Sequence, residues 1–521
     1  MNLKRAFKDK HHIYILFSVL SVSVLLGYTL YTNHIWEDFF ITFRCSQNLI
    51  EGKGLVYNEG EKIHVFTSPL GVLLPAISYY ISGKISYLYA IWIFRLLFCI
   101  PAFMLAVYYF LKSFDLNYKN SEFLPAVFLG TLILFDAKSV MFSVNGMETA
   151  FMLLFWALSL YSMINDFKIN SWITGITWAG FMWTRPDSCV YIGAIIAVAF
   201  IFSENRQKLM KRLIKPLLIG TIFYLPWFLF AWIYYGTPVP NTVLAKKAMS
   251  SFSFISSIKH SLQHISWAFE APYQFMGGWT DYSKYFAYFL TLFSLFYWLI
   301  PIKDKFGKKL SFLFFLLSFY FIFMPFPYPW YFPPLTILGF MVIVNGIWKI
   351  LENFPKYTIW RIPILSMILF NILFFMLLIA YEMKMQQKFI ENGVRKKVGL
   401  WLKKYAPKEE NVYLECLGYI GFFSEKKMLD YPGLATPSSV KYLKEKKCGR
   451  IELIKYLKPD WVVLRDWEFQ MAKKYKFFIN NYSVKKYISA EVELSNHPGI
   501  PGISYLYYDH AFVICRKIKN F

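Results

Sequence analysis

The feature that most constrains this chain is a series of apolar runs long enough to cross a lipid bilayer. The first covers residues 13–31, and others fall near 88–111, 123–140, 147–164, 171–184, 187–202, 216–235, 285–301, 311–323, 333–350 and 362–381. A helix needs about 20 apolar residues to cross the hydrocarbon core. With 57% hydrophobic residues, the composition is also not that of a soluble domain. We therefore predict a polytopic α-helical membrane protein with about 11 transmembrane helices by this length criterion.

The first apolar run is expected to be a retained span. It follows the basic residues Lys4, Arg5, Lys8 and Lys10. A secretory signal would have a shorter apolar core and a cleavage site made of small residues. Neither is present here, so the run is interpreted as the first transmembrane helix.

The distribution of basic residues predicts the orientation. Lys and Arg gather in short connections, namely KNSE near 119, SENRQKLMKR at 203–212, IKDKFGKK at 302–309, and the stretch 349–361. Such loops are typical of the cytoplasmic side, where they face anionic lipid. The net charge of +24 therefore indicates membrane lipid as a partner, and no basic–aromatic nucleic-acid-binding module is visible. We expect a bacterial inner (cytoplasmic) membrane protein with a cytoplasmic N-terminus.

This orientation divides the chain into two domains. Residues 1–382 form a transmembrane module, with a first outer loop at 33–86 and a long outer loop at 236–284. Counting 69–81 as a span would place the basic loops on opposite sides, so we expect a helix lying along the interface there. Residues 383–521 are Lys-rich and mixed, which predicts an α/β domain on the outer face. NVYLECLGYIGFFS, DWVVLRD and SYLYYDHAFVICRK have strand-like content, and Cys416, Cys448 and Cys515 leave a disulfide open.

A carboxylate pair stands where the first span ends. Glu37 and Asp38 lie in WEDFFITFR, and acidic groups at a membrane boundary are often functional. A carboxylate there can take the proton of an incoming hydroxyl. Because adjacent carboxylates repel, the pKa of one of them is raised. The plain alternative is a helix N-terminus that prefers acidic residues. We predict Asp38 as the base, with Glu37 beside it.

Basic side chains on the outer loops are candidates for binding a lipid phosphate. Arg44 lies six residues after Asp38 and either binds phosphate or holds the carboxylates in place. Arg185 in WTRPDS either binds phosphate or forms a buried ion pair with Asp187. Lys246 and Lys247 follow a bent loop, where they either bind phosphate or are solvated surface charges.

Three further residues are candidates for contacting substrate. Glu148, in NGMETAF, is either a second active-site acid or a helix N-terminal charge. His64 either donates to substrate or is structural, and Tyr331 belongs to an aromatic turn suited to sugar stacking or to the membrane interface. No metal motif is present, although a divalent cation between Asp38 and Glu148, with Glu37 near, stays open.

Several segments together resemble a known family. WEDFFITFRCSQNLIEGKGLVYNEGEKIHVFTSPLG is similar to the first outer loop of GT-C-type polyprenyl-phosphate-dependent glycosyltransferases, in the subgroup of the mycobacterial β-1,2-arabinofuranosyltransferase. NGMETAF, TRPD, YYGTPVPNTVLAKKA, YPWYFPPL and ECLGYIGFFSEKKMLDYPGLA follow in the family's order over nearly the whole chain. The resemblance extends more distantly to protein O-mannosyltransferases and the lipid A aminoarabinose transferase. The family pattern has Asp where this chain has Glu37, and usually Glu or another polar residue at the position of His64.

The resemblance implies an inverting single displacement on the outer face of the membrane. A polyprenyl-phosphate sugar is the implied donor, a hydroxyl of an envelope glycan, lipid or protein is the acceptor, and Asp38 matches the family's base. A polysaccharide ligase or polymerase would use the same face. A lipid-linked sugar flippase is a non-enzymatic alternative, but it would need charged groups along midplane helices, and no internal repeat is visible. A non-catalytic scaffold for envelope assembly is a further alternative.

Overall fold

The computed structural model describes residues 11–116, 123–249, 254–270, 281–324 and 327–518. The basic residues at 4–10 and the KNSE stretch lie outside these ranges, as do parts of the loop at 236–284 and of the aromatic turn. The helical module contains α2 (His11–Thr32), α3 (Glu37–Ile50), α4 (Leu70–Ile81), α5 (Tyr87–Phe94), α6 (Ile100–Asp115), α7 (Leu124–Phe135), α8 (Ala137–Val144), α9 (Thr149–Ile164), α10 (Ser171–Thr184), α11 (Ser188–Ile201), α12 (Arg206–Tyr235), α13 (Asn241–Met249), α14 (Phe254–Lys259), α15 (Ser261–Ser266), α16 (Asp281–Phe296), α17 (Lys305–Phe323), α18 (Pro333–Glu352) and α19 (Arg361–Met385).

The C-terminal part contains both helices and strands. Its helices are α20 (Lys396–Tyr405), α21 (Tyr419–Ser424), α22 (Pro437–Lys446), α23 (Arg450–Leu457), α24 (Asp466–Ala472), α25 (Lys476–Asn481), α26 (Glu491–Ser495) and α27 (Ile503–Tyr508), and its strands are β1 (Val412–Leu414), β2 (Met428–Asp430), β3 (Trp461–Arg465), β4 (Tyr482–Ser489) and β5 (Ala511–Lys517). Two π-helical segments (Arg95–Cys99 and Gln386–Arg395) and three 3₁₀ segments (Tyr297–Leu299, Pro329–Tyr331 and Pro355–Trp360) complete the set.

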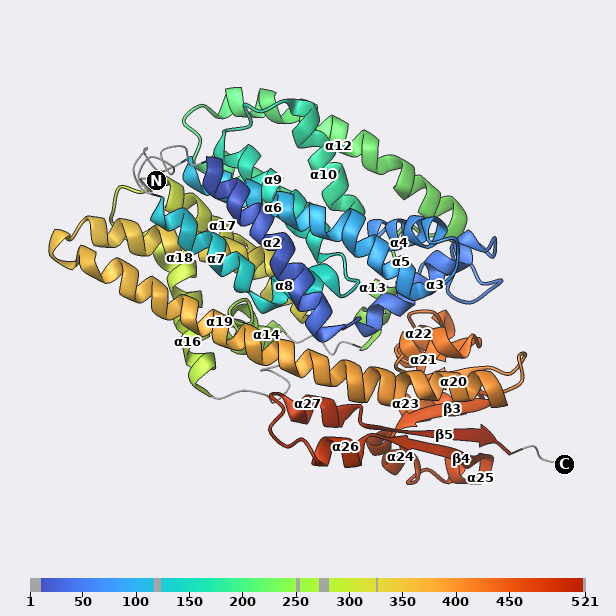
Figure 1. The fold of residues 1–521 in the computed structure, drawn as a ribbon. Helices are drawn as coiled ribbons and strands as arrows, with labels where there is room; N and C mark the ends of the chain where they lie inside the picture. Colours follow the sequence, from blue (N-terminus) through green and yellow to red (C-terminus); the bar gives the residue numbers. More distant parts are fainter. Residues whose placement is uncertain (1–10, 117–122, 250–253, 271–280, 325–326, 519–521) are drawn as a thin grey trace.

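The membrane module is built from long apolar helices, as the sequence predicts. Among the described residues, six helices are long and apolar enough to span a bilayer, or seven if the bent pair α7–α8 is one span. They share one core with shorter neighbours, and Trp156 and Phe94 are fully buried in it. Figure 1 shows α2 crossing the middle of this layer in front, with α12 along its upper edge. The chain is a polytopic helical membrane protein.

Four of the predicted spans appear as shorter helices. The runs near 147–164, 171–184, 187–202 and 285–301 correspond to α9, α10, α11 and α16, and α10 has only 14 residues. A helix of that length rises about 21 Å, less than the hydrocarbon thickness. The run near 123–140 bends by 52°, because Asp136 interrupts it and accepts a hydrogen bond from the backbone N–H of Ser139 at 2.8 Å. The number of crossings therefore stays a prediction, as does the interfacial position of α4.

The C-terminal part is an α/β unit with a mixed five-stranded sheet in the order β2-β1-β3-β5-β4. The pairs β1–β2 and β1–β3 are parallel, while β5 runs antiparallel to β3 and β4. Two segments predicted to be strands are helical: GYIGFFS forms α21 and SYLYY forms α27. Their aromatic side chains pack against the helical module and the helices that lead into the C-terminal part. Burial rather than β-propensity therefore accounts for the aromatic content of these two segments. All six cysteines are free.

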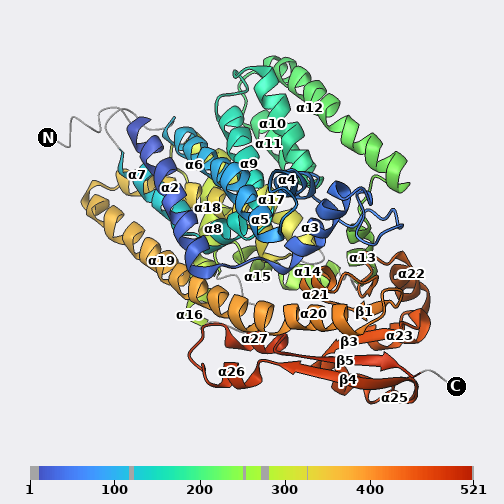
Figure 2. The same ribbon diagram turned by 45° about the vertical axis from the view of Figure 1, so that its right-hand side comes forward.

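One continuous helical stretch joins the two parts. It runs over Pro355–Tyr405, a length of 51 residues, and includes α19, the π-helical segment and α20. In Figures 1 and 2 it lies along the lower side of the helical layer and ends against the sheet. The predicted domain boundary at 382/383 falls inside this stretch. The C-terminal sheet is thus attached through a continuous helical element.

The C-terminal part also packs directly on α3. Arg44 on α3 donates to the carbonyl oxygens of Gly421 at 2.7 Å and Lys426 at 2.8 Å. The hydroxyl of Tyr57 donates to the carbonyl of Leu417 at 2.6 Å. Gly418 approaches Glu37 so closely that a Cβ there would lie 2.0 Å from the Glu37 carbonyl oxygen. The two parts therefore share one packed interface.

We expect Gly418→Ala to destabilise this interface, because the added methyl group has no room beside a backbone atom. Overpacking of this kind costs about 1–3 kcal/mol. The measurement is the thermal unfolding midpoint of the purified protein in nanodiscs, which should fall. Gly499→Ala is the matched control, since a Cβ at Gly499 meets nothing within 4 Å. Equal midpoints for the two variants would contradict the close packing of Gly418 on Glu37.

Candidate active site

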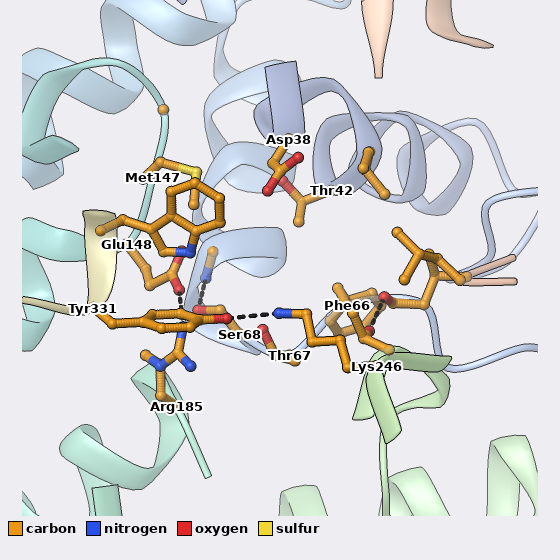
Figure 3. Close-up of a pocket in the computed structure, with 17 residues that line it drawn as sticks. Asp38, Thr42, Phe66, Thr67, Ser68, Met147, Glu148, Arg185, Lys246 and Tyr331 are labelled. Atoms are coloured by element: carbon orange, nitrogen blue, oxygen red, sulfur yellow. Dashed lines mark hydrogen bonds and ion pairs between the residues drawn. The ribbon is translucent and has the colours of Figure 1, made fainter. Parts of the chain in front are cut away.

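A small cavity lies where α3 meets the turns before α9 and after α10. It has a volume of about 80 Å³ and is lined by acidic, basic and hydroxyl side chains, including Asp38, Glu148, Arg185, Lys246 and Tyr331. Figure 3 shows Asp38 on one side of this cavity, with Lys246, Tyr331 and Arg185 across from it. Five predicted site residues that are far apart in sequence therefore meet in one place.

Asp38 and Glu37 open helix α3 and are both only partly exposed. Burial raises the pKa of Asp38, although nearby Lys246 acts in the opposite direction. Burial likewise raises the pKa of Glu37, and Arg395 opposes this shift. The Glu37 carboxylate accepts a hydrogen bond from the backbone N–H of Gly418 at 2.6 Å. The two side chains thus differ in role: Asp38 faces the cavity, whereas Glu37 is held by the C-terminal part.

Arg185 stands at the end of α10 in a network of carboxylates. Its guanidinium donates to both oxygens of Asp187 at 3.0 Å and to Glu148 at 3.1 Å. The hydroxyl of Tyr320 donates to Asp187, which fixes that carboxylate from the other side. The sequence left a buried ion pair and a phosphate ligand as alternatives for Arg185, and the structure contains the ion pair at the wall of the cavity.

Lys246 lies on α13, whose first turn is tied to two other segments. The Asn241 amide side chain donates to the carbonyl of Gly433 at 2.6 Å, and the Thr242 hydroxyl donates to the carbonyl of Val65 at 2.6 Å. From this anchored helix Lys246 donates to the hydroxyl oxygen of Tyr331 at 2.7 Å.

The Tyr331 ring lies between two cations. The Arg185 guanidinium lies 4.1 Å from the ring centroid, and Lys246 bonds the hydroxyl. Burial opposes ionisation of this phenol, yet Lys246 and Arg185 hold the pKa of Tyr331 below its ordinary value. Both cations sit at the cavity wall opposite Asp38. Arg185 is paired with Asp187 and Glu148, whereas Lys246 bonds a phenol and can stabilise a negatively charged group.

Two larger cavities meet at this point. The first, of about 910 Å³, is a mainly apolar groove between α10, α12, α13 and α17, with Met182, Phe228 and Phe323 in its lining. The second, of about 750 Å³, is a polar cleft between α3 and the C-terminal sheet, with Asp38, Glu415 and Arg450 in its lining. Thr242 and Lys246 line both of them as well as the small cavity.

Arg44 and His64 lie away from the small cavity. Arg44 takes neither of its two expected roles, whereas His64 takes the structural alternative. Arg44 is bound to backbone carbonyls of the C-terminal part and lies over the Tyr57 ring at 4.4 Å, so it holds the interface. His64 is buried, and its ring stacks on Tyr235 with centroids 4.7 Å apart. Burial lowers the pKa of His64 to about 4, which leaves it neutral at pH 7.

Neither Lys247 nor a metal-binding group belongs to the small cavity of the described residues. Lys247 lines the apolar groove and not the small cavity. Within the part of the chain that the structure describes, there is no group of three or more His, Cys, Asp and Glu side chains placed to hold a metal ion. Asp38 and Glu148 share the cavity but do not assemble such a group.

Sequence reasoning missed several polar residues of the site. Thr67, Ser68 and Thr242 line the small cavity with hydroxyl groups, and Glu415 lines the polar cleft near Asp38. Thr67 and Ser68 lie in FTSPLG, Thr242 in PNTVLAKKA and Glu415 in ECLGYIG, all segments that the family resemblance covers. That resemblance was the available signal, because single hydroxyl residues carry no spacing pattern.

We expect His64→Phe to keep the thermal unfolding midpoint of the protein in nanodiscs or to raise it slightly. Phenylalanine retains the stacked ring and removes two buried ring nitrogens that have no hydrogen-bond partner among the described residues. His64→Ala is the comparison and should unfold at a lower temperature, because it leaves a void beside Tyr235. A lower midpoint for His64→Phe than for His64→Ala would contradict the structural role.

The chain is similar in sequence to a domain family and to a characterised transferase. A domain family of unknown function (DUF8728) matches residues 379–499. The terminal β-(1→2)-arabinofuranosyltransferase of Mycobacterium tuberculosis is 24% identical over 251 residues, which is 44% of this chain and 38% of that protein. The chain thus spans well under half the length of this curated relative.

Solved structures show the same fold. ArnT from Cupriavidus metallidurans bound to undecaprenyl phosphate superposes with a TM-score of 0.56 at 10% identity, covering 97% of this chain and 98% of that one. The archaeal oligosaccharyltransferase AglB from Archaeoglobus fulgidus, in complex with an inhibitory peptide and a dolichol-phosphate, superposes with a TM-score of 0.54 at 12% identity, covering 92% and 73%. In partial sequence similarity and in fold, the chain is similar to the GT-C-type polyprenyl-phosphate-dependent glycosyltransferases, which confirms the resemblance predicted from its motifs.

Proposed function

We propose that this protein is an inverting glycosyltransferase that acts on the outer face of the cytoplasmic membrane. It moves a sugar from a polyprenyl-phosphate donor to a hydroxyl group. The observation that carries the proposal is the junction at Lys246. There an apolar groove, a polar cleft and the cavity with Asp38 meet. A lipid-linked donor and a polar acceptor need separate entrances that converge on one base.

The groove suits the lipid chain of the donor. Its apolar lining lies between membrane helices, and its volume of about 910 Å³ is enough for part of a prenyl chain. The ArnT structure named above contains undecaprenyl phosphate in the same fold. With the lipid in the groove, the donor phosphate lies next to Lys246, whose charge stabilises it as it leaves, while Arg185 stays paired with Asp187 and Glu148. Tyr331 holds both cations in position.

Asp38 then acts as the base. The oxygen of the acceptor hydroxyl attacks the anomeric carbon from the face opposite the phosphate and passes its proton to Asp38. The bond between the anomeric carbon and the phosphate oxygen breaks, and its electron pair goes to the phosphate. Because Asp38 and Lys246 lie across the cavity from each other, base and leaving group are on opposite sides, as inversion requires.

The predicted orientation completes the proposal. The N-terminus would be cytoplasmic, and the first outer loop at 33–86 and the unit at 383–521 would lie outside, in a bacterial inner membrane. The acceptor is then an envelope glycan, lipid or protein.

Asp38→Asn tests the catalytic step. Loss of a general base lowers kcat by about 10²–10⁴-fold, while the apolar groove and its cations are unchanged. The measurement uses purified protein in nanodiscs with a panel of undecaprenyl-phosphate sugars and follows the release of undecaprenyl phosphate. Binding of undecaprenyl phosphate itself, measured by native mass spectrometry, should stay at the wild-type level.

Asp166→Asn is the matched control, since Asp166 pairs with Lys309 outside the three cavities. Normal transfer by Asp38→Asn would remove the assigned base. A flippase would be identified instead if Asp38→Asn moved a sugar-linked lipid across the membrane of proteoliposomes as fast as the wild type, and the wild type showed no glycosyl transfer. Transfer of a pre-assembled glycan and not of single sugars would identify a ligase or polymerase.

The pH dependence gives a second test. Asp38 must be ionised to accept a proton, and its pKa is raised by burial, so kcat/KM should rise with pH through that elevated pKa. Lys246 favours the ionised carboxylate. Lys246→Met should therefore move the acid limb of the pH profile to higher pH, in addition to weakening phosphate binding. Lys247→Met is the control and should leave the position of the limb unchanged; a shift toward lower pH in Lys246→Met would contradict the assignment.

A further inference from the structure

The polar cleft lies at the carboxyl ends of all three parallel strands of the C-terminal sheet. Glu415 and Cys416 follow β1, Tyr431 and Pro432 follow β2, and Arg465 ends β3; all five line the cleft. The segment before β5, with Tyr508 and Asp509, closes the same side. The cleft is therefore formed by the loops at one end of the sheet and not by an accidental gap between domains.

The strand order gives this end of the sheet a further property. β1 and β3 are neighbours, but β1 connects to β2 on one side and β3 leads to β4 and β5 on the other. Where connections leave adjacent parallel strands in opposite directions, a crevice opens outside their carboxyl ends, and ligands of open α/β sheets bind there. Glu415 and Arg465 stand at this crevice.

The charges that line the cleft largely neutralise one another. Arg465 pairs with Asp509, Glu415 and Glu468, and Arg395 pairs with Glu391 and Asp509. Burial opposes ionisation of Asp509, but Arg465 and Arg395 hold its pKa below the usual range.

Arg450 in turn bonds Glu468. Because these guanidinium groups are already bound to carboxylates, the cleft is not built to take up a phosphate or another strong anion.

What remains open to a ligand is aromatic and hydrogen-bonding surface. Tyr508 is 45% exposed and lies beneath Arg465, whose guanidinium is 4.9 Å from its ring centroid. Tyr431 is held in the same way under Arg450 at 4.8 Å. The Glu415 side chain is 34% exposed. Its Oε2 accepts from Arg465, and among the described residues its Oε1 has no hydrogen-bond partner.

We propose that this crevice is the acceptor subsite and that it binds a neutral saccharide chain, a conclusion that rests on the proposed glycosyl transfer. Flat, rigidly held aromatic faces match the apolar faces of sugar rings, and a carboxylate oxygen accepts from sugar hydroxyls. The cleft continues from Tyr508 and Glu415 to Asp38 and Lys246, so a saccharide bound there presents a terminal hydroxyl to the base.

The other acceptor classes fit this crevice less well. An extended peptide commonly adds along the free edge of a sheet, whereas the crevice lies at the carboxyl ends of the strands and not along the free edge of β2 or β4. A lipid acceptor needs a continuous apolar lining, and the charged side chains of Glu415, Arg450 and Arg465 interrupt the lining of the cleft. The crevice therefore favours a hydroxyl-rich ligand.

The test uses the full-length protein in nanodiscs on a printed array of neutral oligosaccharides, anionic oligosaccharides and peptides. Wild type should bind neutral oligosaccharides, and Tyr508→Ala and the near-isosteric Glu415→Gln should weaken that binding about tenfold, the upper range for one stacked ring. Tyr456→Ala and Glu425→Gln are matched controls outside the cleft. Tyr456 lies against the ring of Tyr442 as Tyr508 lies against that of Trp467, and Glu425 pairs with a cation as Glu415 does. In transfer assays with the best-bound oligosaccharide, the acceptor KM should rise about tenfold while kcat stays within about twofold.

Each failure has its own signature. Three results would contradict the assignment of the saccharide subsite. They are no binding of neutral oligosaccharides, better binding of peptides or anionic glycans, or wild-type affinity in both Tyr508→Ala and Glu415→Gln while Asp38→Asn abolishes transfer. The proposed function is overturned, and the saccharide site retained, if Tyr508→Ala loses saccharide binding while Asp38→Asn transfers normally. Asp38→Asn should bind the array as wild type does, since Asp38 acts on the proton and not on the sugar rings.

Discussion

The packing of helix α3 between the membrane module and the C-terminal sheet is the interaction on which the rest depends. Glu37 and Asp38 open this helix, and Gly418 touches Glu37 so closely that no larger residue fits. Arg44, on the same helix, binds two carbonyl groups of the C-terminal part. Without this contact the carboxylates would face water and their raised pKa values would relax. The C-terminal part is therefore a wall of the site as well as an attached domain.

Electrostatics divides the site into two regions. At the small cavity, Lys246 bonds the Tyr331 hydroxyl and faces Asp38, while Arg185 is paired with Asp187 and Glu148, so the charge of Lys246 is available to a leaving group. In the polar cleft, Arg465 and Asp509 neutralise each other together with their neighbours. The first arrangement suits phosphate and the second suits a neutral partner. A donor and an acceptor can thus be recognised separately although both entrances share Lys246.

Much of the site could be predicted from the chain because its residues lie in short motifs at helix ends. Asp38, Glu148, Arg185, Lys246 and Tyr331 were selected as polar groups next to apolar runs, and they converge in the structure. Arg44 and His64 met the same criterion but turned out to hold an interface and to stack on Tyr235. Spacing along a helix tells which residues lie on the same face of that helix, but it does not tell which other segment packs against that face. The strand-like segments GYIGFFS and SYLYY became helices for a related reason, since their aromatic content reflects burial.

The order of residues is enough to predict a helical membrane protein with a mixed C-terminal part, because the length and apolar character of each run are local properties that decide whether it can span a bilayer. Which polar groups meet depends instead on the three-dimensional fold. Lys246 and Tyr331 are 85 positions apart, and Glu37 and Gly418 are 381 apart. The loop-lined crevice at the ends of β1 and β3 likewise exists only once the strands are ordered. Such contacts depend on the packing of whole elements, which no window along the chain contains.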